Sequence, residues 1–226
     1  MVYSIHIPKT MGSSFGDALC KTIPNSYIIS NCPNCDKYLV EDGISTMSQK
    51  TAEIERDKEC QGCITLDEVH ANIRSNRYSI LHGHPSFHII NVLEDTQVIT
   101  WLRNPIQRVI FHYFFDERHG NTELGIYEFV EEQSNIYQKY LQGIKEFFFI
   151  GIVENKDMDL VKFFSMSNVY EFEIETLNTN PNKQNVNETY KYDLDLYNHI
   201  VKHNGRDIQL YNTVCLNIGR RDLIID

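Results

Sequence analysis

The sequence lacks several features that would place the protein in other classes. It has no run of about 18 consecutive apolar residues, so no transmembrane helix is predicted. Its N-terminal segment lacks the basic, apolar and small-residue regions of a secretory signal, and we expect a cytoplasmic protein unless an upstream segment is missing. It also lacks a basic excess, since 21 Lys and Arg stand against 31 Asp and Glu, a net charge of -10. Nucleic acids and anionic membranes attract basic surfaces, so neither is expected as the main partner.

Segments with strand-like and helix-like patterns alternate along the 226 residues. Strands are predicted at 2–7, 27–30, 78–81, 97–102, 147–153 and 169–172. Helices are predicted at 13–23, 47–57, 65–75, 86–93, from 105 onwards, at 126–132, 135–141 and 158–164, and twice near the end of the chain. This alternation predicts one α/β domain over residues 1–226, with a P-loop-like parallel sheet covered by helices on both faces. Ligands of such folds bind at the carboxyl ends of the strands.

The segment HIPKTMGSSF, which follows the first predicted strand, has the composition of an anion-binding turn. A strand, a tight turn and a helix N-terminus together hold phosphates on backbone N–H groups. We expect Ser13 or Ser14 to cap the helix. It is not a Walker A loop, because Lys9 precedes Gly12 instead of following the last glycine. An ordinary turn with its lysine in water is the alternative.

Two further sites follow predicted strands. In LHGHPSF, the histidines His82 and His84 flank a glycine, and either can serve as a general base near neutral pH. A metal pair, or one core and one exposed histidine, would give the same pattern. In WLRNPIQRVIFHYFF, Arg103 ends an apolar strand and Pro105 opens a helix, which suits an arginine that binds a second phosphate. A solvent-facing Arg103 and a salt bridge by Arg108 are the alternatives.

Taken together, these segments resemble the motifs of carbohydrate sulfotransferases that use 3'-phosphoadenosine 5'-phosphosulfate. HIPKTMGSSF is similar to their 5'-phosphosulfate loop, and WLRNPIQRVIFHYFF is similar to their 3'-phosphate motif. LHGHPSF resembles the HGH segment of the heparan sulfate and uronyl 2-O-sulfotransferase branch. FFFIGIVENKDMDLVKFF is similar to a later strand and helix of that family. The resemblance runs in order from residue 2 to about residue 164.

The resemblance implies a transfer of a sulfuryl group from this donor to a glycan or other hydroxyl acceptor. By this resemblance, Lys9 neutralises the charge on the departing oxygen and Arg103 binds the 3'-phosphate. His84, or alternatively His82, accepts the proton of the acceptor hydroxyl. The resemblance also implies that the 5'-phosphate is bound by the loop residues, namely Thr10, Met11, Gly12, Ser13 and Ser14.

Two positions depart from the family pattern. Met11 replaces a small loop residue, which would crowd the anion site. Phe111 stands where the family has a serine that binds the 3'-phosphate, so this contact must be weaker or arranged differently. Two other functions therefore remain open: a P-loop-like nucleotide kinase, although GK[ST] and an Asp-rich magnesium site are lacking, and a catalytically weakened interaction protein that kept the fold.

A polar insertion at residues 31–63 carries two CxxC pairs, Cys32 with Cys35 and Cys60 with Cys63. Four thiolates at this spacing can hold one tetrahedral zinc, and a small polar segment without a core needs such a staple. The gap of 24 residues between the pairs is longer than in a compact zinc ribbon. We expect a structural zinc without a part in the transfer; two disulfides and four free thiols are the alternatives.

Overall fold

The computed structural model describes residues 1–24, 26–29, 75, 79–83, 96–174 and 193–225. Their elements follow one another as β1 (Val2–Ile5), α1 (Gly12–Thr22), β2 (Ser26–Ile29), β3 (Ile80–Gly83), β4 (Gln97–Leu102), α6 (Pro105–His119), α7 (Ile126–Glu132), α8 (Ile136–Leu141), β5 (Phe149–Ile152), η2 (Val153–Asn155), α9 (Lys156–Met166), α11 (Leu194–His203), α12 (Gly205–Asn217) and η3 (Arg221–Leu223). The predicted helices at 47–57, 65–75 and 86–93 lie outside this part of the chain, except for the turn residue Ser75. The insertion at 31–63 lies outside it altogether.

Five parallel strands form one sheet in the order β2-β3-β1-β4-β5. Strand β1 lies between β3 and β4, with Ile5 paired to Gly83 on one side and to Thr100 on the other. The chain runs from β1 to one edge of the sheet through β2 and to the other through β4 and β5. The loops after β1 and β4 therefore flank the point where the strand order reverses, which is where sheets of this kind bind ligands.

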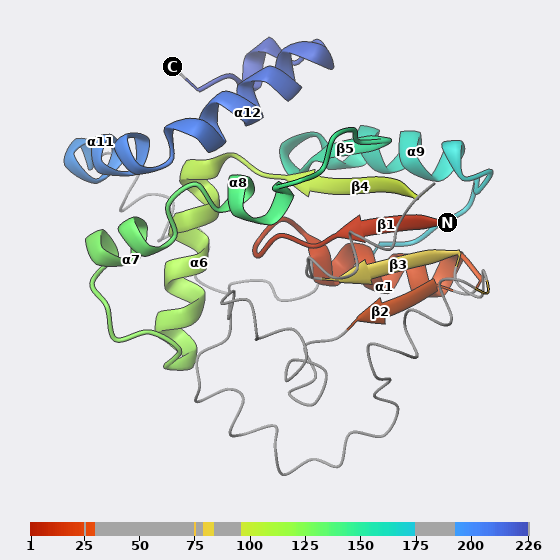
Figure 1. Ribbon diagram of the computed structural model, residues 1–226, viewed down its shortest axis with the longest axis horizontal. Coiled ribbons are helices and arrows are strands. Elements are labelled where there is room, and N and C mark those ends of the chain that lie inside the picture. The colour runs from red at the N-terminus through yellow and green to blue at the C-terminus, as the bar shows by residue number, and fades with distance from the viewer. Residues whose placement is uncertain (25, 30–74, 76–78, 84–95, 175–192, 226) are drawn as a thin grey trace.

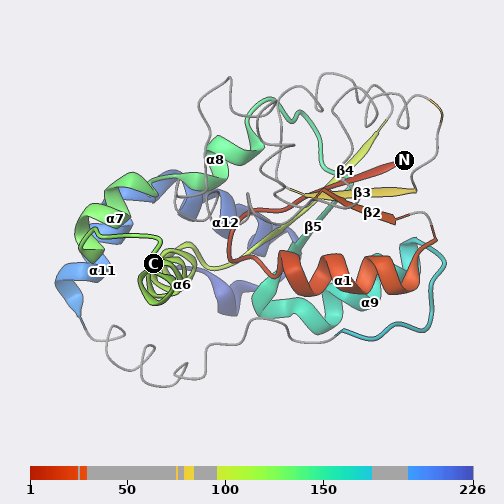
Figure 2. The same ribbon diagram turned by 90° about the horizontal axis from the view of Figure 1, so that it is seen from below.

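Side chains alternate along each central strand, so both faces of the sheet are apolar. Tyr3 and Ile5 of β1 belong to a core cluster with α8 and α12. On the opposite face, Ile99 and Trp101 of β4 pack with α1 and α9. Figure 2 shows α1 and α9 beside each other on this face. The predicted α/β fold, a parallel sheet with helices on both faces, is confirmed.

Helix α6 stands beyond the carboxyl ends of β1 and β4 (Figure 1). Pro105 occupies its first turn, and the side chain of Asn104 accepts hydrogen bonds from the N–H groups of Ile106 and Gln107. These two signals start the helix where the sequence predicts it. A third cluster, which includes Val109, Phe129 and Ile200, joins α6 to α7 and α11.

The predicted strand at 169–172 is wrong. The chain leaves α9 through Asn168, whose φ is 57°, and residues 169–174 form neither strand nor helix. Val169 and Phe172 instead pack against the cluster of α1 and α9. Their apolar spacing therefore reflects partial burial against this cluster and not pairing with a neighbouring strand. No described helix has the length and apolar character needed to cross a membrane.

Candidate active site

The turn between β1 and α1 has the geometry of an anion site. Thr10 donates its hydroxyl to the carbonyl of Ile7 at 2.8 Å, which closes the turn. Lys9 and Met11 both adopt positive φ, 68° and 69°. The helix begins at Gly12 and Met11 is its N-cap, so the predicted caps Ser13 and Ser14 are wrong. Met11 makes no side-chain cap hydrogen bond, and a helix start without such a cap is a common position for an anion.

The side chain of Met11, expected to crowd this turn, packs against the cluster of α1 and α9. Ser13 is exposed and Ser14 is buried, so they face different surroundings within the first turn.

Gly12 is required by a close approach of the His6 ring, which a Cβ at this position would overlap. His6 stacks on His82 with ring centroids 5.5 Å apart. The two imidazoles therefore pack together behind the first turn of α1.

His82, one of the two candidate bases, is buried at 4% exposure in β3. Its Nε2 lies 3.0 Å from the carbonyl oxygen of Gly12 and its Nδ1 lies 2.8 Å from the hydroxyl of Ser4. A carbonyl only accepts hydrogen bonds, so Nε2 donates to Gly12, and Nδ1 shares the second hydrogen bond with the Ser4 hydroxyl. Both ring nitrogens thus fix the helix start against the sheet. His84, the other candidate, lies outside the described residues.

Lys9 extends from the turn to the C-terminal half of α6. Its ammonium lies 3.0 Å from the ring centroid of Phe115. Burial lowers its pKa to about 8, while the carboxylate of Asp116 raises it and the charges of Arg118 and Arg103 lower it. Lys9 forms no ion pair at contact distance with a carboxylate of the described residues. A desolvated ammonium without such a partner suits an incoming anion.

Arg103, at the end of β4, supplies the second cation. Its guanidinium lies 5.0 Å from the ring centroid of Phe111. Burial lowers its pKa, and the nearby Glu154 raises it. Its backbone is fixed by Tyr137, whose hydroxyl donates to the Arg103 carbonyl at 2.5 Å and accepts from the Arg103 N–H at 3.1 Å. Burial raises the pKa of the Tyr137 phenol, so this hydroxyl stays protonated and can donate.

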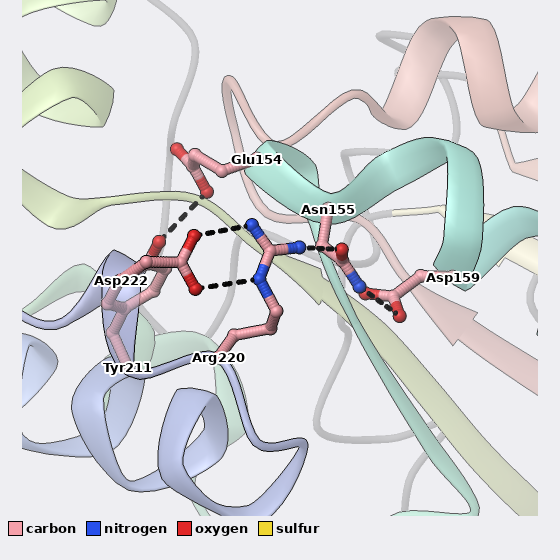
Figure 3. A network of polar contacts seen from close by, with 6 residues as sticks. All are labelled: Glu154, Asn155, Asp159, Tyr211, Arg220 and Asp222. Atoms are coloured by element: carbon pink, nitrogen blue, oxygen red, sulfur yellow. Dashed lines mark hydrogen bonds and ion pairs between the residues drawn. The ribbon is translucent and has the colours of Figure 1, made fainter.

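Glu154 connects the start of α6 to the C-terminal part of the chain, and Figure 3 shows its contact with Tyr211. Its carboxylate accepts from the N–H of Asn104 at 2.9 Å and from the hydroxyl of Tyr211 at 3.1 Å. One carboxylate thus binds both the N-cap residue of α6 and a buried tyrosine of α12. The N-cap residue directly follows Arg103, the residue expected to bind the 3'-phosphate.

Figure 3 also shows a second set of polar contacts, which begins at Asn155, the residue after Glu154. Arg220 donates to both carboxylate oxygens of Asp222, at 2.9 and 2.7 Å, and to the side-chain oxygen of Asn155. Asn155 donates to Asp159 at 2.9 Å, and Asp159 accepts from the N–H of Ile152 at 2.7 Å. The network ties the carboxyl end of β5 to the segment after α12.

Arg108 has a buried position but forms no ion pair at contact distance with a described carboxylate, so the salt bridge considered for it is not found. It is fully buried on α6, where one guanidinium nitrogen donates to the carbonyl of Gln133 at 3.2 Å. Its other two nitrogens have no hydrogen-bond partner among the described residues. Burial lowers its pKa, opposed by Tyr137 and Asp207.

The structure therefore brings together Lys9, Arg103 and the start of α1. The cysteines Cys32, Cys35, Cys60 and Cys63 lie outside the described residues, so their zinc stays a prediction. Sequence reasoning missed Phe115, Asp116 and Glu154. One signal was available in the sequence. Phe111 and Phe115 are four residues apart in the helix that follows Arg103, so both rings lie on the same face of that helix.

No family model matches the sequence, and no curated protein matches it. Among solved structures, the chain is similar to a sulfotransferase from Alicyclobacillus acidocaldarius, with 13% sequence identity and a TM-score of 0.48. The match covers 88% of this chain and 94% of that one. Because the similarity is this low, the function proposed below rests on the residues of the site.

Proposed function

We propose that the protein is a sulfotransferase that moves a sulfuryl group from 3'-phosphoadenosine 5'-phosphosulfate to a hydroxyl of a carbohydrate. One observation carries the proposal: an uncapped helix start, Lys9 and Arg103 converge at the carboxyl edge of the sheet, and neither cation has a carboxylate at contact distance among the described residues. Such a site favours a ligand with two separate anionic groups. The motif order described above supports the same ligand.

In this proposal the first-turn N–H groups of α1 hold the 5'-phosphate and Arg103 holds the 3'-phosphate. The acceptor oxygen bonds to sulfur as the bond between sulfur and the phosphate oxygen breaks, and the electron pair stays on that oxygen. Lys9 stabilises this developing charge, which is stronger in the transition state than in the bound donor. Positioning and charge stabilisation thus supply most of the rate, as in phosphoryl transfer.

One proton must leave the acceptor hydroxyl, and we assign it to His84. Both ring nitrogens of His82 are already hydrogen-bonded within the protein, so His82 is a positioning residue that holds Gly12. We expect His84→Ala to reduce turnover by about two to four orders of magnitude, the usual contribution of a general base. If His82→Ala removed turnover in a folded protein and His84→Ala did not, the base would be His82.

A second candidate function is favoured by the two phenylalanines. Phe115 lies against the Lys9 ammonium and Phe111 against the Arg103 guanidinium, so each cation has an aromatic face where an anion would bind. Cation–π contacts at partly desolvated sites contribute about 0.5–2 kcal/mol. A protein that kept these contacts permanently would be a non-catalytic interaction protein with the same fold.

Calorimetric binding of adenosine 3',5'-bisphosphate separates these functions. We expect binding to the wild type, at least about tenfold weaker binding to Arg103→Ala, and much weaker binding of ATP with magnesium. Preference for ATP with magnesium would indicate a kinase. Absence of binding by either nucleotide to the folded protein would favour the non-catalytic function.

A further inference from the structure

A second cluster of chemically active side chains lies away from Lys9 and Arg103, where α7 packs against α11. His199 and His203 are four residues apart on α11, so both rings lie on one face of the helix, with centroids 4.5 Å apart. Glu131 of α7 faces them. Its Oε1 lies 3.5 Å from the Nε2 of His199 and 3.9 Å from the Nε2 of His203.

These three ligand atoms lie slightly farther apart than the ligands of one metal ion. All three ligand atoms lie within 4.8 Å of one another. Tetrahedral zinc with nitrogen and oxygen ligands at about 2.0–2.1 Å places neighbouring ligand atoms about 3.3 Å apart. The two distances from the Glu131 Oε1 exceed this spacing by about 0.2 and 0.6 Å. Glu131 is 57% exposed, so its carboxylate can move by that amount, and the two imidazole nitrogens, which lie within 4.8 Å of each other, must also approach.

The surroundings of the two histidines also favour metal binding. The Nε2 of His203 is buried and has no hydrogen-bond partner in the described part of the chain. Tyr127 packs edge-on against the His199 ring, with centroids 5.0 Å apart, and so limits its rotation. To bind a metal, the Nε2 of His199 gives up one contact, a long 3.3 Å hydrogen bond to the Tyr127 carbonyl.

We propose that Glu131, His199 and His203 bind one divalent transition-metal ion of the zinc class. Two imidazoles and one carboxylate form a borderline-soft donor set, which prefers such ions to magnesium or calcium. Three protein ligands leave a fourth position for water. The ion would join α7 to α11, and α7 in turn packs against α6, which carries Phe111 and Phe115. The proposal does not depend on the sulfotransferase function.

Equilibrium dialysis of the full chain against zinc chloride tests this site. We expect one equivalent of zinc to bind at this site with micromolar affinity. His203→Ala should abolish this binding, and Glu131→Gln should weaken its affinity by at least about tenfold. Glu132→Gln is the matched control, because it removes the same charge from the next exposed residue of α7. Zinc held by the cysteines would remain in all three variants and is counted separately.

Thermal unfolding gives a second measurement. Zinc bound only to the folded state raises the melting temperature, and we expect this rise in the wild type and in Glu132→Gln to be larger than in Glu131→Gln. Equal zinc stoichiometry, affinity and thermal shift in all the variants would overturn the proposal. So would equal effects of Glu131→Gln and Glu132→Gln, which would indicate a general charge effect.

Discussion

A lysine held against an aromatic ring and close to two arginines should lose its proton at unusually low pH. Burial lowers the pKa of Lys9 from 10.5 to about 8, with Asp116 acting in the opposite direction and Arg118 and Arg103 in the same one. This lowering corresponds to a cost of about 3 kcal/mol for the ammonium form relative to a lysine in water. Replacement of Asp116 by Asn removes the favourable carboxylate, so the pKa of Lys9 should fall further.

NMR titration of protein labelled at the lysine ε-carbons measures this pKa directly, with Lys9→Arg to assign the signal. We expect Lys9 to titrate with a midpoint near pH 8 and to have a lower midpoint in Asp116→Asn. The measurement needs no activity. Titration of Lys9 above about pH 9.5, or no response to Asp116→Asn, would refute the reasoning.

The low pKa of Lys9 should also appear in the pH dependence of the enzyme kinetics. The transfer needs protonated Lys9, so kcat/KM should fall as pH rises through about 8 in the free enzyme. In Lys9→Arg the cation persists, and this fall should disappear even if turnover is reduced. A bound anion favours the ammonium, so adenosine 3',5'-bisphosphate should bind with uptake of protons near pH 8.

Three other features give independent predictions. Gly12→Ala should lower the free energy of unfolding by about 1–3 kcal/mol, measured by urea denaturation, because its Cβ displaces the His6 ring; unchanged stability would contradict this packing. Burial raises the pKa of Asp207 from 3.8 to about 6, so the stability of the wild type relative to Asp207→Asn should fall by up to about 3 kcal/mol as pH rises from 4 to 7, and a constant difference would contradict it. Elemental analysis should find one cysteine-bound zinc per chain that replacement of Cys32 and Cys35 by serine removes; four titratable thiols without zinc would disprove it.

Several elements could be predicted because local signals and burial agree there. The strand at 97–102 and the helix at 126–132 match the structure, and Pro105 with Asn104 fixes the start of α6. The strand prediction at 169–172 failed because Val169 and Phe172 are partly buried against the cluster of α1 and α9 without a partner strand. Pattern alone does not distinguish the two forms of burial.

The candidate site was predicted in part, for a similar reason. Lys9 and Arg103 were found because each follows a strand, and the carboxyl ends of parallel strands lie at one edge of the sheet. The contact of Phe115 with Lys9 was missed, since Phe111 and Phe115 have the spacing of core residues, and Phe111 was singled out only as a departure from the serine of the family pattern. That they face cations depends on how α6 lies across the loops, which is a tertiary property.

Transfer of labelled sulfate from 3'-phosphoadenosine 5'-phosphosulfate to a panel of glycans tests the central claim most directly. The proposal predicts label on a carbohydrate hydroxyl with the wild type, and a fall in turnover of at least about 100-fold with Lys9→Ala, because the lost interaction forms mainly in the transition state. Circular dichroism would check that the variant is folded. No label on any glycan, label on phenols or amines only, or near wild-type turnover of Lys9→Ala would contradict it.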